Sequence, residues 1–365
     1  MNYTHPEDNE EYQGLKIQRA MDKAPTIRNP YFKGLKKRPE YSIDDYVKGI
    51  LDGNMAILAQ AVTLVESSVE EHYHKAQQVI ERCLPYSGKS LRLGITGVPG
   101  AGKSTFIENL GMDIVGQGKK LAVLAIDPSS EKSKGSILGD KTRMEQLSVH
   151  KNAFIRPSPS AGSLGGVARK TRETIILCEA AGFDVVFVET VGVGQSETAV
   201  HSMVDFFLLI QLAGTGDELQ GIKRGIMEMA DGIVINKADG TNIQKANLAK
   251  THFQNALHLF PMPESGWAPQ VLTCSAFHHL NLDKVWQMII DYAAFTKNNG
   301  YFAEKRLSQS KYWMYETIEQ QLKHNFYNNP LIEQQLQQIE TDLMHNRITP
   351  FIAANNLFDI YKKSF

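Results

Sequence analysis

The stretch Gly97–Ser104 reads GVPGAGKS and directly follows LRLGIT, a short apolar run that predicts a buried strand. It matches GxxxxGK[ST], the pattern of a loop that binds phosphate. Its glycines let the backbone curl so that successive N–H groups face one anion. The next residues, TFIENLG, predict a helix whose N-terminus adds its dipole to the same site. We therefore expect this loop to bind a nucleoside triphosphate.

The residues of this loop have distinct expected roles. Lys103 would reach the β- and γ-phosphates, and Ser104 would place its hydroxyl on Mg²⁺. The backbone and side chains of the whole loop would surround the phosphates, and the expected binding residues are Gly97, Val98, Pro99, Gly100, Ala101, Gly102, Lys103, Ser104 and Thr105.

Between residues 91 and 297, apolar runs alternate with helical stretches. The runs are LRLGIT, KLAVLAID, DVVFVE, DFFLLIQL, DGIVINK and PQVLTCS, which are rich in Val, Ile and Leu. This composition is typical of parallel strands that are covered on both faces. The alternation predicts an α/β fold with a doubly wound, mostly parallel sheet. Ligands bind such sheets at the carboxyl ends of the strands, where every motif below is expected.

Changes in composition predict four segments. Residues 1–41 are polar and are expected to form a partly disordered arm. Residues 42–88 are expected to be helical, because Ser42 and Asp45 resemble a capping box and apolar residues then recur at helical spacing. Residues 89–298 form the expected nucleotide-binding domain, and residues 299–365 form a C-terminal helical extension.

The C-terminal extension carries a stripe of apolar residues at helical spacing. Such a stripe forms either an intramolecular core face or the seam of a dimer. Its members are Ile332, Leu336, Ile339 and Leu343.

The sequence Asn236-Lys237-Ala238-Asp239 follows the apolar run DGIVI and predicts recognition of guanine. The Asp239 carboxylate can accept hydrogen bonds from the N1–H and the 2-amino group of guanine, whereas adenine would leave it unpaired. The stem of Lys237 would lie along the base, and Asn236 would tie the loop to its neighbours. At Ser275-Ala276, after the run VLTCS, a backbone N–H would contact guanine O6. GTP is therefore the expected nucleotide.

Carboxylates at two other strand ends are candidates for the metal and for catalysis. Glu189 ends the run DVVFVE, in a place where many GTPases have Asp, and a glycine, Gly192, follows three residues later. The carboxylate would hold the water shell of Mg²⁺, and the Gly192 N–H would approach the γ-phosphate. Gln195 would orient the attacking water.

Asp127 follows the run KLAVLAI, and Asp140 lies further along the same loop. Both are expected near Mg²⁺ or the attacking water, although Asp127 precedes Pro128 and can instead serve a turn. The expected metal ligands are Ser104, Asp127, Asp140 and Glu189. The expected catalytic residues are Lys103, Asp127, Asp140, Glu189 and Gln195.

The segment QLAGTGDELQGIKRGIMEMAD combines glycines with charges at a strand's carboxyl end. Such a loop can sense the nucleotide and contact a partner, and a solvated loop is the alternative. The candidate partner-contacting residues are Asp217, Glu218 and Lys223.

Composition excludes several classes of protein. The net charge of -1 over 365 residues argues against a nucleic-acid-binding surface. Three scattered cysteines form no disulfide framework, which suits a reducing compartment. No apolar run approaches the ~20 residues needed to span a bilayer, and the N-terminus lacks the apolar region of a signal peptide. We expect a cytoplasmic protein that contacts neither nucleic acid nor membrane.

Seven strings together resemble one family. They are GVPGAGKST, AIDPSS, GDKTRM, SPSAGSLGGVARKTRE, ETVGVGQSE, QLAGTGDELQGIKRGIMEMAD and NKAD. They resemble the MeaB/ArgK-type GTPases, whose human relative is the methylmalonic aciduria type A protein, and the resemblance covers about residues 42–296. It implies a P-loop GTPase that works as a homodimer, like the nickel-delivery and signal-recognition GTPases. Members of the family gate the delivery of adenosylcobalamin to methylmalonyl-CoA mutase and protect or reactivate that enzyme.

The resemblance also implies roles for individual residues. Lys103 and Ser104 would hold phosphate and Mg²⁺, and Asp239 would read guanine. Residues 211–227 match an additional switch that communicates with the mutase. Within this segment, Lys223 is the residue that we would test first. The carboxylates around metal and water would be Asp127, Asp140 and Glu189.

Two other functions compete with this one. A metallochaperone that delivers nickel or another metal would need clustered Cys or His ligands near the switches. The close pair His72 and His74 is spaced i, i+2, so on a helix its members point to different faces. A non-catalytic scaffold would bind GTP only as a structural ligand.

Overall fold

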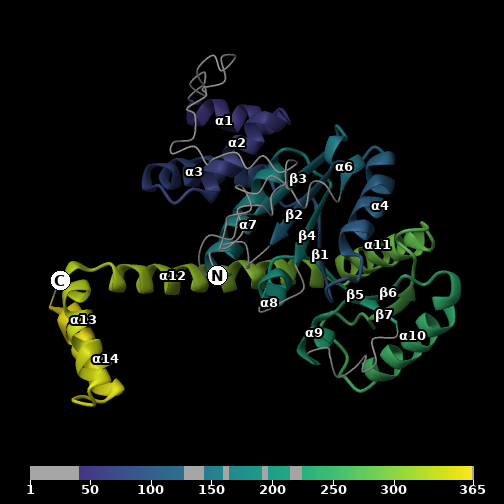
Figure 1. Ribbon diagram of the computed structural model, residues 1–365. Coiled ribbons are helices and arrows are strands. Elements are labelled where there is room, and N and C mark those ends of the chain that lie inside the picture. The colour runs from purple at the N-terminus through teal and green to yellow at the C-terminus, as the bar shows by residue number, and fades with distance from the viewer. Residues whose placement is uncertain (1–40, 127–143, 159–163, 191–195, 214–223, 364–365) are drawn as a thin grey trace, which may run out of the picture. The chain divides into compact units, whose positions relative to one another are not determined.

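The computed structural model describes residues 41–126, 144–158, 164–190, 196–213 and 224–363. In these residues seven strands form one sheet in the order β3-β2-β4-β1-β5-β6-β7 (Figure 1). Every neighbouring pair is parallel, so the predicted doubly wound parallel sheet is confirmed. The strands are β1 (Leu91–Gly97), β2 (Leu121–Ile126), β3 (Ala153–Ser158), β4 (Val185–Thr190), β5 (Phe206–Leu212), β6 (Gly232–Asn236) and β7 (Gln270–Thr273).

Strand β3 is the one strand of this sheet that the sequence did not predict. It pairs with β2 alone and therefore forms an edge of the sheet. Its sequence includes Arg156 and Pro157, which interrupt the apolar pattern. An edge strand tolerates proline because one of its sides has no ladder to complete.

Alternate residues of the inner strands enter two separate cores. Leu208 and Ile210 of β5 pack into one core with α4 (Lys103–Gly116) and α11 (Leu282–Asn298). Leu209, between them, packs into the other core with α10 (Ile243–Leu257). Successive side chains of a strand point to opposite faces, so helices cover the sheet on both sides.

The remaining helices of this layered domain are short, apart from α7. Helix α6 packs against α4 and β3, and α7 packs against β2. Helices α8 and α9 pack against β1 and β5 respectively. Their bounds are α6 (Glu145–Val149), α7 (Leu164–Ala180), α8 (Ser196–His201), α9 (Arg224–Met229) and the 3₁₀ turn η4 (Gly240–Asn242).

The N-terminal helices begin where the sequence predicts. Ser42 caps the first of them: its Oγ accepts from the Asp45 N–H at 3.2 Å, and Asp45 Oδ2 accepts from the Ser42 N–H at 2.9 Å. The expected capping box is therefore present. These helices pack against α7, and Lys170 of α7 donates to the Glu66 carbonyl at 2.7 Å. They are α1 (Ile43–Leu51), α2 (Met55–Glu66), α3 (Glu70–Cys83) and the 3₁₀ turn η3 (Leu84–Tyr86).

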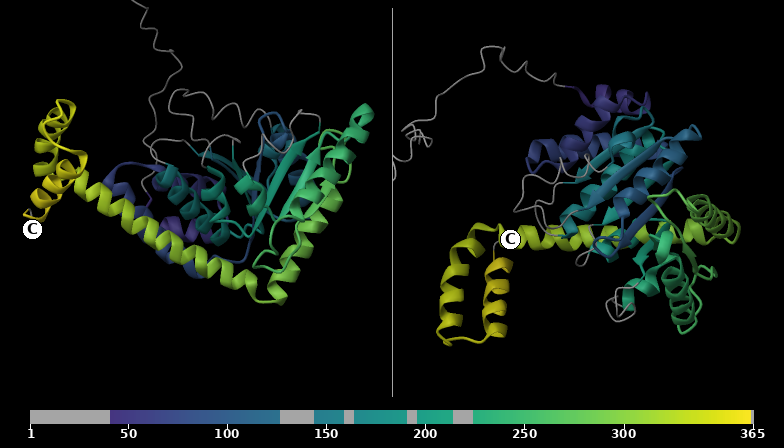
Figure 2. Two further views of the ribbon diagram at one scale, coloured as in Figure 1. Left: turned by 90° about the horizontal axis from the view of Figure 1, so that it is seen from below. Right: turned by 45° about the vertical axis from the view of Figure 1, so that its right-hand side comes forward.

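The C-terminal extension consists of α12 (Tyr301–Tyr327), α13 (Pro330–Met344) and α14 (Pro350–Lys362). Figure 2 shows α13 and α14 side by side after the long helix α12. Within the predicted stripe, Ile332 is fully buried. The ring centroid of Phe326, at the end of α12, lies 5.0 Å from the ring centroids of both Phe358 and Tyr361 on α14.

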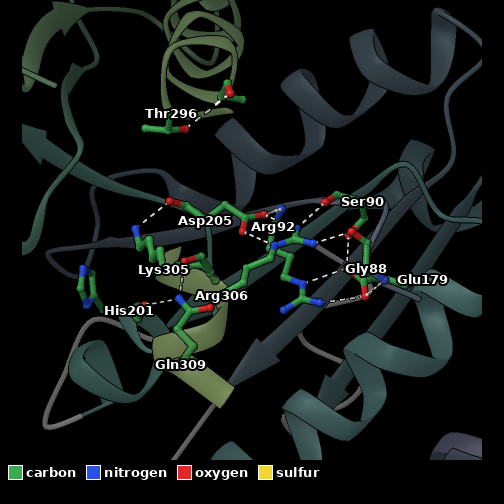
Figure 3. A network of polar contacts seen from close by, with 12 residues as sticks. Gly88, Ser90, Arg92, Glu179, His201, Asp205, Thr296, Lys305, Arg306 and Gln309 are labelled. Atoms are coloured by element: carbon green, nitrogen blue, oxygen red, sulfur yellow. Dashed lines mark hydrogen bonds and ion pairs between the residues drawn. The ribbon is translucent and has the colours of Figure 1, made fainter. Parts of the chain in front are cut away.

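A polar network joins the start of α12 to the amino ends of the strands (Figure 3). Arg306 donates to the backbone carbonyls of Gly88 and Ser90 at 2.5 and 2.7 Å. Arg92 of β1 pairs with Glu179 of α7 at 2.8 Å. The network holds the start of α12 at the amino ends of the strands. The predicted nucleotide site lies at their opposite, carboxyl ends.

Candidate functional site: phosphate loop and base loop

The phosphate loop depends on glycine where it leaves β1. A Cβ atom at Gly97 would lie 2.1 Å from the carbonyl oxygen of Ile210 on β5. Gly100 and Gly102 have φ values of 79° and 85°, in the left-handed region that favours glycine. Gly102 is the N-cap of α4, so the loop ends at a helix N-terminus. Backbone N–H groups and the helix dipole therefore favour an anion here.

Lys103, the first residue of α4, folds back over the loop. Its Nζ donates to the carbonyl oxygens of Gly97 at 2.9 Å and Val98 at 3.3 Å. Burial lowers the pKa of Lys103 below its ordinary value, and the charges of Glu189 and Glu197 oppose that shift. The ammonium thus lies among backbone carbonyls and two buried carboxylates, where an incoming phosphate can replace the carbonyl partners.

Ser104 and Glu189 provide the oxygen ligands that Mg²⁺ prefers. The Ser104 hydroxyl hydrogen-bonds to none of the described residues. Glu189 lies buried near the end of β4, close enough to Lys103 to influence its charge. The next residue, Thr190, donates to Thr96 Oγ1 of β1 at 2.8 Å, which ties this strand end to the strand before the phosphate loop.

Asn236 connects the phosphate loop to the base-recognition segments. Its Nδ2 donates to the Ala101 carbonyl at 2.7 Å, and its Oδ1 accepts from the Ala276 N–H at 2.9 Å. The side chain is buried at the end of β6. A Cβ atom on Gly102 would lie 2.8 Å from the same Nδ2, so the contact requires glycine there. The tie between loops expected of Asn236 is therefore present.

The Asp239 carboxylate is held by Ser275. Ser275 Oγ donates to Asp239 Oδ2, and Ser275 itself is fully buried. A carboxylate oxygen has more than one acceptor site, so this bond leaves capacity for a ligand. Lys237, two residues earlier, is exposed and has a φ of 57°. Asn242 Nδ2 fixes the Lys237 carbonyl at 2.8 Å.

Residues 275–280, which we call the base loop, form a tight closed turn. The Ser275 N–H donates to the Leu280 carbonyl at 3.1 Å, and the reverse bond is 3.0 Å long. The Ala276 N–H donates to Asn236. We expected one of these two N–H groups to contact guanine O6, but both already have acceptors inside the protein.

Seven of the residues predicted for function lie outside the described part of the chain. They are the candidate water- and metal-binding residues Asp127, Asp140, Gly192 and Gln195 and the candidate partner-contacting residues Asp217, Glu218 and Lys223. The described candidates Lys103, Ser104, Glu189, Asn236, Asp239 and Ser275 all lie at the carboxyl edge of the sheet, as predicted.

Sequence reasoning missed two residues of this region. Glu197 of α8 is buried and acts on the charge of Lys103, and no sequence motif singled it out. Asn109 of α4 donates from Nδ2 to the Ala276 carbonyl at 2.7 Å. The two residues of that bond are separated by 167 positions, so no local motif could reveal it.

The chain matches one family model and several known proteins. The family model "Methylmalonyl Co-A mutase-associated GTPase MeaB" matches residues 58–331, which include both the phosphate loop and the base loop. A putative GTPase of Caulobacter vibrioides is 49% identical over 319 residues, covering 87% of this chain and 98% of that protein. GTPase ArgK of Escherichia coli is 44% identical over 326 residues, covering 89% and 98%.

Two further relatives extend the comparison. The mitochondrial methylmalonic aciduria type A homolog of Mus musculus is 42% identical over 340 residues, covering 90% of this chain and 82% of that protein. A crystal structure of a LAO/AO transport system kinase superposes with a TM-score of 0.71 at 38% identity, covering 90% of this chain and all of that one. With a GTPase fold, a glycine-dependent phosphate loop and a base loop joined to it through Asn236, the chain belongs to the MeaB family of GTPases.

Proposed function

We propose that this GTPase uses GTP binding and hydrolysis to gate the delivery of adenosylcobalamin to a methylmalonyl-CoA mutase-type enzyme and to protect that enzyme. The observation that carries the proposal is the family match over residues 58–331, because that family is described by its association with methylmalonyl-CoA mutase. The mouse relative is named a methylmalonic aciduria type A homolog, and this name also supports a link to methylmalonyl-CoA mutase.

The nucleotide would bind along the carboxyl edge of the sheet. Lys103 would exchange its carbonyl partners for the β- and γ-phosphates, and backbone N–H groups of the phosphate loop would complete the cradle. Asp239, held by Ser275, would accept from the N1–H and 2-amino groups of guanine. Buried polar groups that match one base and not another can discriminate by ~10⁴-fold.

Mg²⁺ fits the oxygen ligands of this site. Ser104 would bind the ion directly, and Glu189 would hold its water shell. When bound, the ion supplies charge that stabilises the transferred phosphoryl group. Asp127, Asp140, Gly192 and Gln195 remain proposed members of the site, as does the contact of Lys223 with the partner enzyme.

A reconstituted system tests the function. The chain is mixed with a methylmalonyl-CoA mutase and adenosylcobalamin, and GTP hydrolysis and cofactor transfer are both measured. We expect slow hydrolysis by the chain alone, faster hydrolysis with the mutase, and cofactor loading that requires GTP. Lys103→Ala is the matched control, because it removes the phosphate contact. Hydrolysis that the mutase does not accelerate, together with cofactor loading that does not require GTP, would refute the proposal. A chain that binds GTP without ever hydrolysing it would instead be a scaffold.

A metallochaperone is the alternative function. The same experiment tests it when nickel replaces adenosylcobalamin. Within the described ranges, no group of three or more His, Cys, Asp and Glu residues is arranged to hold a metal ion. No observation favours this alternative over the mutase.

We also propose that the chain works as a homodimer through its C-terminal extension. Tyr315, Ile318 and Leu322 of α12 are exposed and follow each other at helical spacing. Further exposed apolar residues lie on α13 and α14, and an accumulation of this kind marks an interaction surface. These additional residues are Leu331, Met344, Phe351, Ile352 and Phe358.

The proposed place of action is the cytoplasm. All three cysteines are free and buried, which is compatible with a reducing compartment. No helix in the described residues combines the length and the apolar character needed to cross a bilayer.

A further inference from the structure

We propose that Asn109 is a positioning residue for guanine recognition: it orients the peptide between Ala276 and Phe277 so that the Phe277 N–H contacts the oxygen at position 6 of the base. The proposal deepens the function above and rests on guanine binding at this site. It assigns the position-6 contact to a residue that differs from the one expected from the sequence, and it gives α4 a part in reading the base.

The base loop is fastened to α4 at two points. Asn109 Nδ2 donates to the Ala276 carbonyl at 2.7 Å, and His279 Nε2 lies 3.0 Å from Asp113 Oδ1. Asn109 and Asp113 are four residues apart and therefore lie on the same face of the helix. Helix α4 begins at Lys103, so one rigid element positions both the phosphate-binding lysine and the base loop.

Most backbone donors of the base loop are already used. Ser275 and Leu280 exchange hydrogen bonds with each other, and the His279 N–H donates to the Ala276 carbonyl at 3.4 Å. The Ala276 N–H donates to Asn236 Oδ1, and the His278 N–H donates to Ser275 Oγ at 3.2 Å. Among the described residues, none accepts from the N–H of Phe277. This N–H is the loop donor that remains for a ligand.

The geometry of the peptide bond links this donor to Asn109. The Ala276 C=O and the Phe277 N–H belong to one planar trans peptide, in which the two groups point in opposite directions. Asn109 holds the C=O on the inner side, where Ala276 is only 1% exposed. The N–H therefore points outward, at a residue that is 79% exposed.

The outward direction places the donor beside the predicted guanine reader. Ser275, the residue before this peptide, holds the Asp239 carboxylate. Guanine presents its N1–H and its position-6 oxygen side by side, so an acceptor at Asp239 and a donor at Phe277 match neighbouring positions on one edge. Adenine carries an amino donor at position 6, which would face the N–H donor and leave both unpaired.

Nucleotide analogues separate this contact from the Asp239 contact. In 6-thioguanosine diphosphate, sulfur, a weak acceptor, replaces the position-6 oxygen, while the N1–H and the 2-amino group remain. Inosine diphosphate keeps the oxygen and lacks the 2-amino group. Affinities of wild type and Asn109→Ala for GDP and both analogues are measured by calorimetry in the full chain.

We expect Asn109→Ala to weaken GDP binding by about five- to tenfold, the value of one neutral hydrogen bond. Its affinity for 6-thioguanosine diphosphate should hardly change, so the preference for GDP over that analogue falls. The preference for GDP over inosine diphosphate should stay the same, because Asp239 is untouched. Gln117→Ala, at an exposed position at the end of the same helix, is the control and should match wild type.

Two results would overturn the proposal: unchanged GDP affinity in Asn109→Ala, or an equal loss for all three nucleotides, which would indicate general loosening of α4. Failure of the proposed function looks different, because wild type itself would then show no preference for GDP over ADP.

A second measurement requires no change at Asn109. In a chain labelled with nitrogen-15 at phenylalanine, the amide signal of Phe277 is identified by its disappearance in Phe277→Leu, which keeps the backbone N–H. We expect this amide proton to shift strongly downfield with GDP and much less with 6-thioguanosine diphosphate. Equal shifts with the two nucleotides would contradict the assignment.

Discussion

Arg306 of α12 and Asp205, the residue before β5, form a buried ion pair with an Nη2–Oδ2 distance of 2.7 Å. Arg306 Nε also donates to Asp205 Oδ1 at 2.7 Å, so the contact is bidentate. Asp205 Oδ2 additionally accepts from the Arg92 N–H of β1 at 2.8 Å. One carboxylate therefore joins α12 to the starts of β1 and β5. Strand β1 ends at the phosphate loop, and β5 ends where the proposed partner switch begins.

Arg306→Ala is expected to lower the free energy of unfolding by about 3 to 5 kcal/mol, because it leaves the Asp205 carboxylate buried without its partner. Urea unfolding measures the loss. Fluorescence of Trp313 gives a second signal, since its Nε1 donates to the Ser202 carbonyl at 3.0 Å and undocking of α12 would break this bond. Arg306→Lys is the matched control: it keeps the charge but loses the bidentate contact, and its loss should be smaller. Equal stability of Arg306→Ala and wild type would show that the pair does not hold the helix.

Gly97→Ala is expected to prevent the phosphate loop from forming. The new methyl group would meet the Ile210 carbonyl at 2.1 Å, and both partners are backbone in paired strands that cannot move apart without breaking β1 from β5. The variant should fail to bind GDP and should unfold at a much lower temperature. Gly100→Ala is the comparison. A Cβ there meets nothing within 4 Å, so the only cost of this substitution is the strain of its left-handed φ. If Gly97→Ala binds GDP as tightly as Gly100→Ala, the close approach does not constrain the loop.

The sequence predicted the parts of this protein that depend on local pattern. The apolar runs predicted six of the seven strands in the described sheet, and the glycine spacing predicted the phosphate loop, because both signals lie within a few consecutive residues. Edge strand β3 escaped prediction, because Arg156 and Pro157 interrupt its apolar run. The bonds of Asn109 to Ala276 and of Arg306 to Asp205 escaped it for another reason: each joins residues about a hundred or more positions apart. Such contacts depend on the packing of whole elements.

Asp239→Asn is expected to exchange the base preference from guanine to xanthine. The amide would offer an N–H toward position 2, where xanthine has a carbonyl oxygen and guanine an amino group. Ser275 would still hold the other atom of the side chain, so the orientation should survive. Competition between GDP and xanthosine diphosphate measures the exchange. Unchanged GDP affinity in the variant would show that Asp239 does not read the base.

Ile318→Glu combined with Leu322→Glu is expected to convert the proposed dimer into a monomer, because two charges would enter the exposed apolar surface of α12. Light scattering after size-exclusion chromatography measures the mass of each form. Lys323→Glu changes charge on the same helix without removing an apolar side chain, and it should remain dimeric. A wild-type chain that is monomeric at all concentrations would refute the homodimer itself.

His201, at the end of α8, is expected to make the protein less stable as the pH falls. Burial lowers its pKa from 6.5 to about 4, the nearby charge of Lys305 adds to that shift, and Asp231 opposes it. Between these two values the unfolded chain binds a proton that the folded chain does not, so the free energy of unfolding rises with pH in this window. The stability contributed by neutral His201 is complete above about pH 6.5 and is lost progressively toward pH 4, to a total of about 3 kcal/mol. Urea titrations across this range should therefore show a shallower pH dependence for His201→Gln than for wild type. His252→Gln, at an exposed histidine, should follow wild type, and parallel curves for wild type and His201→Gln would place the acid sensitivity on another group.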